Sequence, residues 1–484
     1  MTTTRTTTTT TQAPGALQTR RGRLLLALVC AVAFLDFVDV TIINVALPAI
    51  RDDLGFSLQQ LQWVPSGYLL TYGGFMLLGG RMADLLGRRR VLLAGLTTFG
   101  LASLLGGLAD TPETLVVARM VQGIGAALSL PAALSILTTT FTTRAERHLA
   151  LGIWGSVAGI ASAAGVLMGG VLTETAGWRW VMLINPVLCV GLVGAILVLV
   201  EFEAPAAVRR GFDLLGTVLA TGAMLLLVYT LVEAPDRGWA DPATVGGLAG
   251  AAVVLTAFVL VEARAAAPLL PLPVLRLPGL VAANVVQLAT SAGFLAMFFF
   301  VTVYMQEVLG YGAVRTGLAY IPSCLMAAAS AACGAQLIAR FGSRPLVVGG
   351  SVVTGSGILL LSRLPADGSY AVDLLPGLML LCSGVGFVFV TVAAAANAGV
   401  GAESAGVAAA LLNSAQQIGA ALGLAVLAAV SSPVVSDRLA TGATPAEALS
   451  DGFGRALFVA AGFLFAAAVV GLRTVNTHDP EPIA

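Results

Sequence analysis

Two carboxylates inside an apolar run constrain this chain more than any other feature of its sequence. The run extends from Leu24 to Ile50 and is long enough to cross a bilayer at ~1.5 Å of helical rise per residue. It contains Asp36 and Asp39, whose spacing of three places both on one face of a helix. A charge at membrane depth costs at least ~2.5 kcal/mol. The pattern therefore predicts a membrane helix with one face toward a wet cavity and a function for its two acids.

The composition indicates that lipid solvates most of the chain. Of 484 residues, 58% are hydrophobic and 10% are charged, whereas soluble globular proteins carry roughly 25% charged residues. The net charge is zero, which does not favour a nucleic-acid partner. The five cysteines lie in apolar runs without CxxC spacing and predict buried thiols, not a metal site or a disulfide framework. Both histidines, His148 and His478, lie in polar segments, so carboxylates must carry any proton through the membrane.

Fourteen apolar runs of about twenty residues, the length of a transmembrane helix, follow one another along the chain. They lie near residues 24–49, 60–80, 90–109, 114–138, 148–172, 180–200, 213–233, 243–262, 279–306, 315–339, 345–364, 371–396, 404–430 and 453–473. With both termini placed in the cytoplasm, seventeen arginines fall in inner segments and seven in outer ones. Because basic residues accumulate on the cytoplasmic side, the sequence predicts this orientation.

The runs divide into two sets of six that are related by a repeat. Gly80–Arg90, after the second run, resembles Ala335–Pro345, after the tenth, with Gly87 matching Gly342 in the turn. This predicts an N-terminal six-helix half (24–200), an inserted two-helix linker (201–277) and a C-terminal six-helix half (278–473), an architecture typical of transporters. The threonine-rich segment 1–23 is predicted to be a disordered cytoplasmic tail and 474–484 a second cytoplasmic tail.

A motif in the first cytoplasmic turn resembles a signature of the major facilitator superfamily, in its fourteen-helix drug:proton antiporter branch. The matching residues are Gly80, Ala83, Asp84, Gly87, Arg88 and Arg89. Gly87 allows a tight turn, and Asp84 can cap a neighbouring helix or pair with an arginine, so such contacts can latch the two halves. The alternative is a solvated basic loop that only obeys the positive-inside rule.

Further stretches extend the resemblance over nearly the whole chain. They are Asp39–Pro48 in the first run, Leu115–Ala127 in the fourth, 406–419 in the thirteenth, and Glu262–Arg264 with 268–270 after the inserted pair. The resemblance implies an all-α integral membrane protein with the major facilitator fold and 14 transmembrane helices. One departure lies in the fifth run, where Gly165, Gly169 and Gly170 are present but Val166 replaces the proline of the antiporter signature. The glycines predict close helix packing, and the kink that the proline would cause is not predicted.

The hypothesis for coupling rests on Asp39 and Arg119. The resemblance implies that the first and fourth helices both line the central cavity, and each residue lies in the outer half of its helix. An arginine stays charged and needs an anion, a carbonyl or water. We expect Asp39, coupled to Asp36, to take up a proton from outside and release it inside, while Arg119 tunes that affinity. The alternative is a static pair that only fixes helix packing.

The substrate cavity is predicted from polar and aromatic residues in the membrane-spanning runs. The candidates are Trp63, Tyr68, Gln122, Asn284, Asn413 and Gln416. An apolar cavity with a few polar groups suits lipophilic compounds. Glu233 and Glu307 lie at predicted outer helix ends, where we expect them to be solvated.

The sequence thus predicts proton-coupled efflux of lipophilic small molecules, such as drugs or antibiotics, across a bacterial cytoplasmic membrane by a monomer. The proton is the coupling ion, and no metal or other cofactor is expected. An importer, or an exporter of an endogenous metabolite or lipid, with the same fold remains the alternative. A membrane enzyme or receptor is disfavoured because the chain has no Gly-x-Ser-x-Gly elbow, phosphate-binding loop or long soluble segment.

Overall fold

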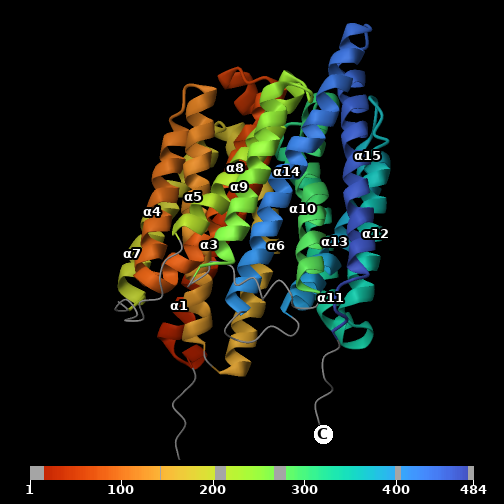
Figure 1. The fold of residues 1–484 in the computed structure, drawn as a ribbon. Helices are drawn as coiled ribbons and strands as arrows, with labels where there is room; N and C mark the ends of the chain where they lie inside the picture. The colour runs from red at the N-terminus through yellow and green to blue at the C-terminus, as the bar shows by residue number, and fades with distance from the viewer. Residues whose placement is uncertain (1–15, 142, 202–213, 266–278, 398–404, 478–484) are drawn as a thin grey trace, which may run out of the picture.

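The computed structural model describes residues 16–141, 143–201, 214–265, 279–397 and 405–477. In this part of the chain the secondary structure is helical, and long helices lie side by side in one bundle (Figure 1). Helix α1 begins and α15 ends at the same end of the bundle. We call that end the termini face and the other end the opposite face.

The N-terminal half contains six long helices and one single-turn helix. These are α1 (Arg20–Leu54), α2 (Leu58–Leu61), α3 (Trp63–Leu86), α4 (Arg88–Gly107), α5 (Pro112–Thr140), α6 (Arg144–Thr175) and α7 (Arg179–Leu199). Helix α1 starts at Arg20, because the Thr19 side chain accepts a hydrogen bond from the Gly22 N–H as a helix N-cap. Part of the segment predicted to be a disordered tail is therefore helical, and residues 1–15 lie outside the described part.

The inserted pair and the C-terminal half follow. Their helices are α8 (Leu214–Arg237), α9 (Pro242–Glu262), α10 (Leu280–Val303), α11 (Ala313–Phe341), α12 (Ser343–Leu361), α13 (Leu375–Asn397), α14 (Ala405–Ala440) and α15 (Pro445–Gly471). Single π-helical turns extend α10 at Tyr304–Val308 and precede α13 at Tyr370–Leu374. The linker residues 268–270, which carry part of the family resemblance, lie outside the described residues.

Within the described residues, eleven helices are long and apolar enough to cross a membrane. Helices α6 and α8 contain shorter apolar stretches, Ile160–Thr175 and Val218–Leu231. The chain is thus a multi-pass membrane protein, and each predicted run coincides with one long helix. Helix α14 continues to Ala440 and α15 begins at Pro445, so both helices extend beyond the apolar runs predicted near 404–430 and 453–473. Polar residues occupy these extensions, and Figure 1 shows the α14–α15 hairpin projecting beyond the other helices.

The two halves meet along α3 with α14 and along α6 with α11. Glycines make these contacts close: a Cβ on Gly170 of α6 would lie 2.6 Å from the Ala313 carbonyl oxygen of α11. Helix α8 packs against both α3 and α14, and the Thr221 hydroxyl donates to the Gly74 carbonyl oxygen at 2.8 Å. The inserted pair therefore covers one seam between the halves.

The internal repeat is visible in the backbone. Gly87 separates α3 from α4 with φ +93°, and Gly342 separates α11 from α12 with φ +78°, a conformation that side chains rarely tolerate. The following arginines also correspond. Arg89 donates to the Leu197 carbonyl oxygen near the end of α7 at 2.9 Å, and Arg344 donates to the Thr474 carbonyl oxygen just after α15 at 2.8 Å. In each half, an arginine after the tight turn binds the C-terminal end of the sixth helix.

Candidate functional site

Both acids of α1 lie inside the N-terminal half. Asp39 has 0% and Asp36 has 3% of its surface exposed. The face of α1 that carries them packs against α3, α5 and α7, which supply their partners. A buried carboxylate is tolerated only when it is paired or hydrogen-bonded, so these partners define the site.

Asp39 accepts hydrogen bonds from three side chains on two helices. Arg119 Nη1 donates to Oδ2 at 2.6 Å, whereas Gln122 Nε2 and Asn185 Nδ2 donate to Oδ1 at 2.8 and 2.7 Å. All four side chains are buried. Hydrogen bonds with an ionised donor or acceptor are short and strong, and here they hold α1 against both α5 and α7. The structure thus brings together the two residues on which the coupling hypothesis rests.

Arg119 is the largest fully buried side chain in the described residues, and its contacts extend beyond Asp39. Its Nε donates to the Val64 carbonyl oxygen at 3.2 Å, and its Nη1 also donates to Gln122 Oε1 at 2.7 Å. Its Cζ lies 4.3 Å from the centroid of the Tyr68 ring, within cation–π distance. The guanidinium therefore contacts α1, α3 and its own helix at once.

Sequence reasoning missed Asn185 and Ser103. Asn185 Nδ2 lies 3.0 Å from Ser103 Oγ, which in turn donates to the Met182 carbonyl oxygen at 2.8 Å. These contacts join α4 and α7 behind Asp39. The available signal was a lone asparagine before Pro186 within the apolar run 180–200, since an isolated polar residue at membrane depth requires a partner.

Asp36 has a different environment. The Tyr68 hydroxyl donates to Oδ1 at 2.8 Å, and the Tyr72 hydroxyl donates to Oδ2 at 2.6 Å. Both tyrosines belong to α3 and are fully buried. Because Tyr68 also lies under the Arg119 guanidinium, it connects the two acid sites.

The residues predicted to line a substrate cavity are dispersed. Tyr68 and Gln122 belong to the buried network, and Trp63 stacks with Tyr229 of the inserted pair at a centroid distance of 6.2 Å. Asn284 of α10 donates to the Leu280 carbonyl oxygen of its own helix at 2.9 Å. On α14, Asn413 and Gln416 are half-buried.

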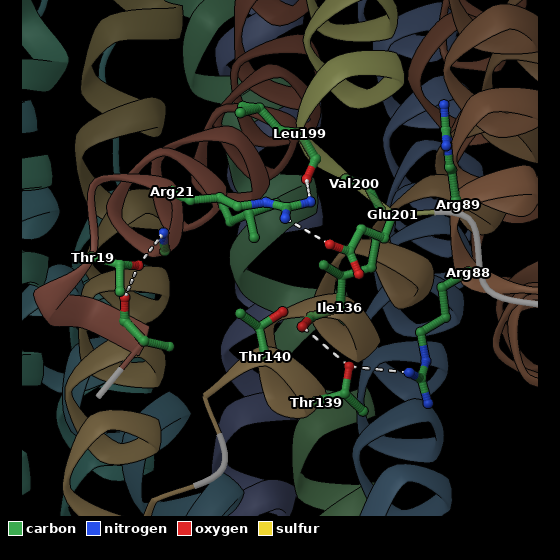
Figure 2. Close-up of a pocket in the computed structure, with 13 residues that line it drawn as sticks. Thr19, Arg21, Arg88, Arg89, Ile136, Thr139, Thr140, Leu199, Val200 and Glu201 are labelled. Atoms are coloured by element: carbon green, nitrogen blue, oxygen red, sulfur yellow. Dashed lines mark hydrogen bonds and ion pairs between the residues drawn. The ribbon is translucent and has the colours of Figure 1, made fainter. Parts of the chain in front are cut away.

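The motif in the turn between α3 and α4, with Gly80, Asp84, Gly87, Arg88 and Arg89, was expected to form a cytoplasmic gate. It lies at the termini face, where Arg88 and Arg89 line a crevice of about 340 Å³ (Figure 2). Arg88 donates to Thr139 Oγ1 at 3.1 Å, and Arg21 forms an ion pair with Glu201 at 2.6 Å across the crevice. A Cβ on Gly80 would meet only Pro131, at an ordinary 3.8 Å. The Asp84 side chain lies outside the described part of the structure.

The three glycines of the antiporter motif lie at close helix contacts. A Cβ on Gly165 would clash with Thr41 Oγ1 at 2.1 Å, and one on Gly169 would lie 2.6 Å from the Ile42 carbonyl oxygen of α1. Gly170 faces α11 instead. Helix α6 therefore packs against α1 with one face and against the other half with another, and no proline interrupts it.

Glu307, which was expected to be solvated, has a side chain that is 24% exposed and also forms an ion pair between the halves. Glu307 Oε1 lies 2.8 Å from Arg51 Nη2, so an ion pair joins the C-terminal half to the end of α1 at the opposite face. Beside it, Gln306 Nε2 donates to the Val45 carbonyl oxygen at 2.9 Å. Glu233 forms an ion pair with Arg237, one turn later on α8, at 3.4 Å.

Two of the five cysteine thiols are buried as expected, whereas Cys333 is exposed.

A bundle of membrane-crossing helices in two repeated halves, with charged residues buried inside it, is the architecture of a secondary transporter. The family model for the Major Facilitator Superfamily matches residues 29–424, and the chain belongs to that family.

Comparison with known proteins identifies relatives of similar length. The chain is 41% identical over 467 residues to the puromycin resistance protein pur8 of Streptomyces alboniger, covering 94% of this chain and 91% of that protein. It is 40% identical over 448 residues to the cephamycin export protein CmcT of Amycolatopsis lactamdurans, covering 92% and 91% of the two chains. Among solved structures, a D-xylose–proton symporter superposes with a TM-score of 0.65 at 12% identity, covering 94% of this chain and 98% of that one. At this identity the likeness concerns the fold alone.

Proposed function

We propose that this protein is a proton-coupled exporter of lipophilic small molecules, antibiotics among them, in the cytoplasmic membrane of a bacterium. The observation that carries the proposal is the buried ion pair of Asp39 and Arg119. Charged residues at membrane depth cost free energy, and in membrane proteins they mark proton, ion or substrate pathways. The names of the similar proteins, which concern puromycin resistance and cephamycin export, support the substrate class.

We also propose the fourteen-span topology of the drug:proton antiporter branch, with the termini face in the cytoplasm. In this topology α3, α6 and α8 cross the membrane together with the eleven helices that satisfy the length and apolarity criteria. The excess of arginines in segments at the termini face supports the orientation. The protein works as a monomer, without a cofactor, and the proton is its coupling ion.

The coupling step follows from the hydrogen bonds of Asp39. Among the described residues, its Oδ2 accepts from Arg119 alone, whereas Oδ1 accepts from two neutral amides. A proton on Oδ2 would face the Arg119 N–H, so that contact must break. Arg119 keeps its contacts with Val64, Gln122 and the Tyr68 ring, and α1 loses its ion pair with α5 while Asp39 Oδ1 keeps its hydrogen bond from Gln122. Protonation thus loosens a contact within the N-terminal half, and α1 also contacts the C-terminal half.

The direction of exchange follows from the energy source. One proton entering against one neutral substrate leaving moves one charge, which is worth ~2.3 kcal/mol per 100 mV of membrane potential. The polar contacts between the halves at the opposite face, Arg51 with Glu307 and Gln306 with Val45, support a state that is closed toward the outside. Release of the substrate outward requires these contacts to separate, and the two halves then rock about the midplane.

Growth of an efflux-deficient bacterium that expresses this protein tests the proposal. Across a panel of antibiotics and dyes, we expect resistance that an uncoupler removes and that Asp39→Asn abolishes without loss of protein from the membrane. Asp52→Asn is the matched control, because Asp52 lies at the end of the same helix but is 69% exposed. Unchanged resistance in the Asp39 variant would exclude Asp39 from the mechanism. Flux into inverted vesicles on addition of a proton gradient separates export from import of a metabolite or lipid.

A further inference from the structure

The crevice at the termini face opens where α1 and α4 begin and where α5 and α7 end (Figure 2). Three arginines line it, Arg21 of α1 and Arg88 and Arg89 of α4. The apolar run of α1 starts shortly after Arg21, at Leu24. The crevice therefore lies where the apolar layer of the protein gives way to charged residues, which is the depth of lipid headgroups.

Two of these guanidiniums meet at the C-terminal end of α7. Arg89 Nη2 donates to the Leu197 carbonyl oxygen at 2.9 Å, and Arg21 Nη2 donates to the Leu199 carbonyl oxygen at 3.1 Å. Figure 2 shows Arg21 reaching across the crevice to Leu199 and to Glu201, with which it forms an ion pair at 2.6 Å. These two charged side chains are 51% and 76% exposed. An ion pair this exposed is weak, so another anion can replace Glu201 on Arg21.

The described part of the crevice carries more positive than negative charge. Arg89 is half-buried, and the acceptor that the described residues offer its guanidinium is the neutral Leu197 carbonyl. Glu201 is the one carboxylate among the described lining residues, so it balances Arg21 and leaves Arg89. A guanidinium carries five N–H donors in a planar fork that matches a phosphate group. A single phosphate monoanion would therefore balance the combined charge of Arg21, Arg89 and Glu201.

Apolar side chains adjoin these charges. Those that line the crevice are Leu25, Ile136, Leu199 and Val200. On the last turn of α7, Leu197 and Val198 are 53% and 80% exposed. An apolar side chain exposed on a membrane-spanning helix contacts lipid tails. The surface thus fits an amphiphile whose anionic head enters the crevice while its chains lie along α7.

The internal repeat supports a ligand here, because the corresponding corner of the C-terminal half is a packed contact. There Ser343 Oγ donates to the Val475 carbonyl oxygen at 2.8 Å, and the Arg344 N–H donates to Asn476 Oδ1 at 3.1 Å. The chain that follows α15 therefore covers the start of α12. In the N-terminal half, Glu201 is the last described residue after α7, and it lines the crevice.

We propose that this crevice binds the phosphate of an anionic phospholipid, with Arg21 and Arg89 as its ligands and with its acyl chains along the last turns of α7. The bound lipid joins α1, α4 and α7 at the termini face and stabilises the N-terminal half. A zwitterionic lipid is disfavoured, because its ammonium group would leave the positive charge of the crevice in excess. This inference goes beyond the proposed function, since it requires neither proton coupling nor export. The proposed orientation only names the leaflet, which is the cytoplasmic one.

The test is lipid binding to the purified full-length protein in detergent, measured by native mass spectrometry with dioleoyl phosphatidylglycerol. Arg21→Gln and Arg89→Gln should each lower the affinity about 5-fold, and the double variant should lower it further. Arg23→Gln is the matched control, because Arg23 is an exposed residue of the same helix that does not line the crevice. It should bind like the wild type. Phosphatidylglycerol should also raise the thermal unfolding temperature of the wild type and of Arg23→Gln, but not that of the double variant.

A further variant and two further ligands complete the design. Glu201→Gln changes an exposed side chain, which keeps the fold intact, and loss of the competing carboxylate should tighten phosphatidylglycerol binding. Phosphatidylethanolamine should bind more weakly than phosphatidylglycerol. Inorganic phosphate has the same anionic group without the chains and should compete only at a much higher concentration.

Three results would overturn the inference. They are wild-type affinity in the double arginine variant, weaker phosphatidylglycerol binding in Glu201→Gln, and competition by inorganic phosphate at the concentration of the lipid. The last would indicate a site for a free anion. These measurements involve no substrate and no proton gradient, so their failure leaves the uncoupler test on Asp39 unaffected.

Discussion

Replacement of Asp39 by asparagine should separate a coupling role from a packing role. The asparagine amide has one acceptor oxygen and one NH₂ group, but three donors converge on this position from Arg119, Gln122 and Asn185. If the oxygen faces the two amides, the NH₂ group meets the guanidinium; if it turns over, the NH₂ group meets the amides. At least one donor then faces another donor in a buried site.

The magnitude follows from the burial of the pair. Both side chains are 1% exposed, and removal of one partner of a buried ion pair costs about 3–5 kcal/mol because it leaves the other charge uncompensated. We therefore expect Asp39→Asn to lower the thermal unfolding temperature of the purified protein clearly. Adding Arg119→Gln removes the orphan charge and supplies an acceptor for the new NH₂ group. The double variant should recover most of the lost stability.

Transport should not return with stability. Uncoupler-sensitive efflux, measured beside thermal unfolding for both single variants and the double variant, should remain absent in the double variant because no group at position 39 can take up a proton. Efflux that recovers together with stability would refute the coupling role and leave a static pair. An Asp39→Asn protein as stable as the wild type would contradict the energetic reasoning itself.

Two further outcomes test the contacts between the halves. Glu307→Gln removes the ion pair with Arg51, and the two side chains are 24% and 25% exposed. Such a pair is worth about 0.5–1 kcal/mol, so the population with an open opposite face should increase about 2- to 5-fold, measured as the distance between spin labels on the two halves at that face. The charge exchange R51E/E307R should reverse the change. Gly170→Ala places a Cβ 2.6 Å from a backbone oxygen of α11 and should reduce the efflux rate. Gly152→Ala on the same helix meets no described atom within 4 Å and should leave the rate unchanged.

The helices could be predicted from sequence because the requirement is local. Each membrane-crossing segment must be apolar over the bilayer thickness whatever its neighbours are. The same reasoning does not reach residues 430–453, where α14 and α15 are helical beyond the predicted apolar runs and the mixed polar sequence does not distinguish helix from loop. Gly87 and Gly342 could also be predicted, since a tight turn with positive φ selects glycine locally.

Partners across the bundle could not be predicted in the same way. The resemblance pointed to Asp39 and Arg119, but Asn185 and Ser103 are single polar residues whose role depends on how α7 and α4 are rotated. Glu307 was expected in solvent because its own helix end predicts exposure. Its partner Arg51 belongs to the other half, and no local pattern contains it.

The sequence by itself determined that this chain crosses a membrane many times and that its two halves repeat. It also determined that the two acids inside the first helix require polar partners or a function at membrane depth. Only the tertiary structure decided which groups bind those acids: an arginine and two amides for Asp39, and two tyrosines of α3 for Asp36. The physical reason is that solvation by lipid acts on each segment separately, whereas a hydrogen bond requires two segments to arrive with matched rotation and depth.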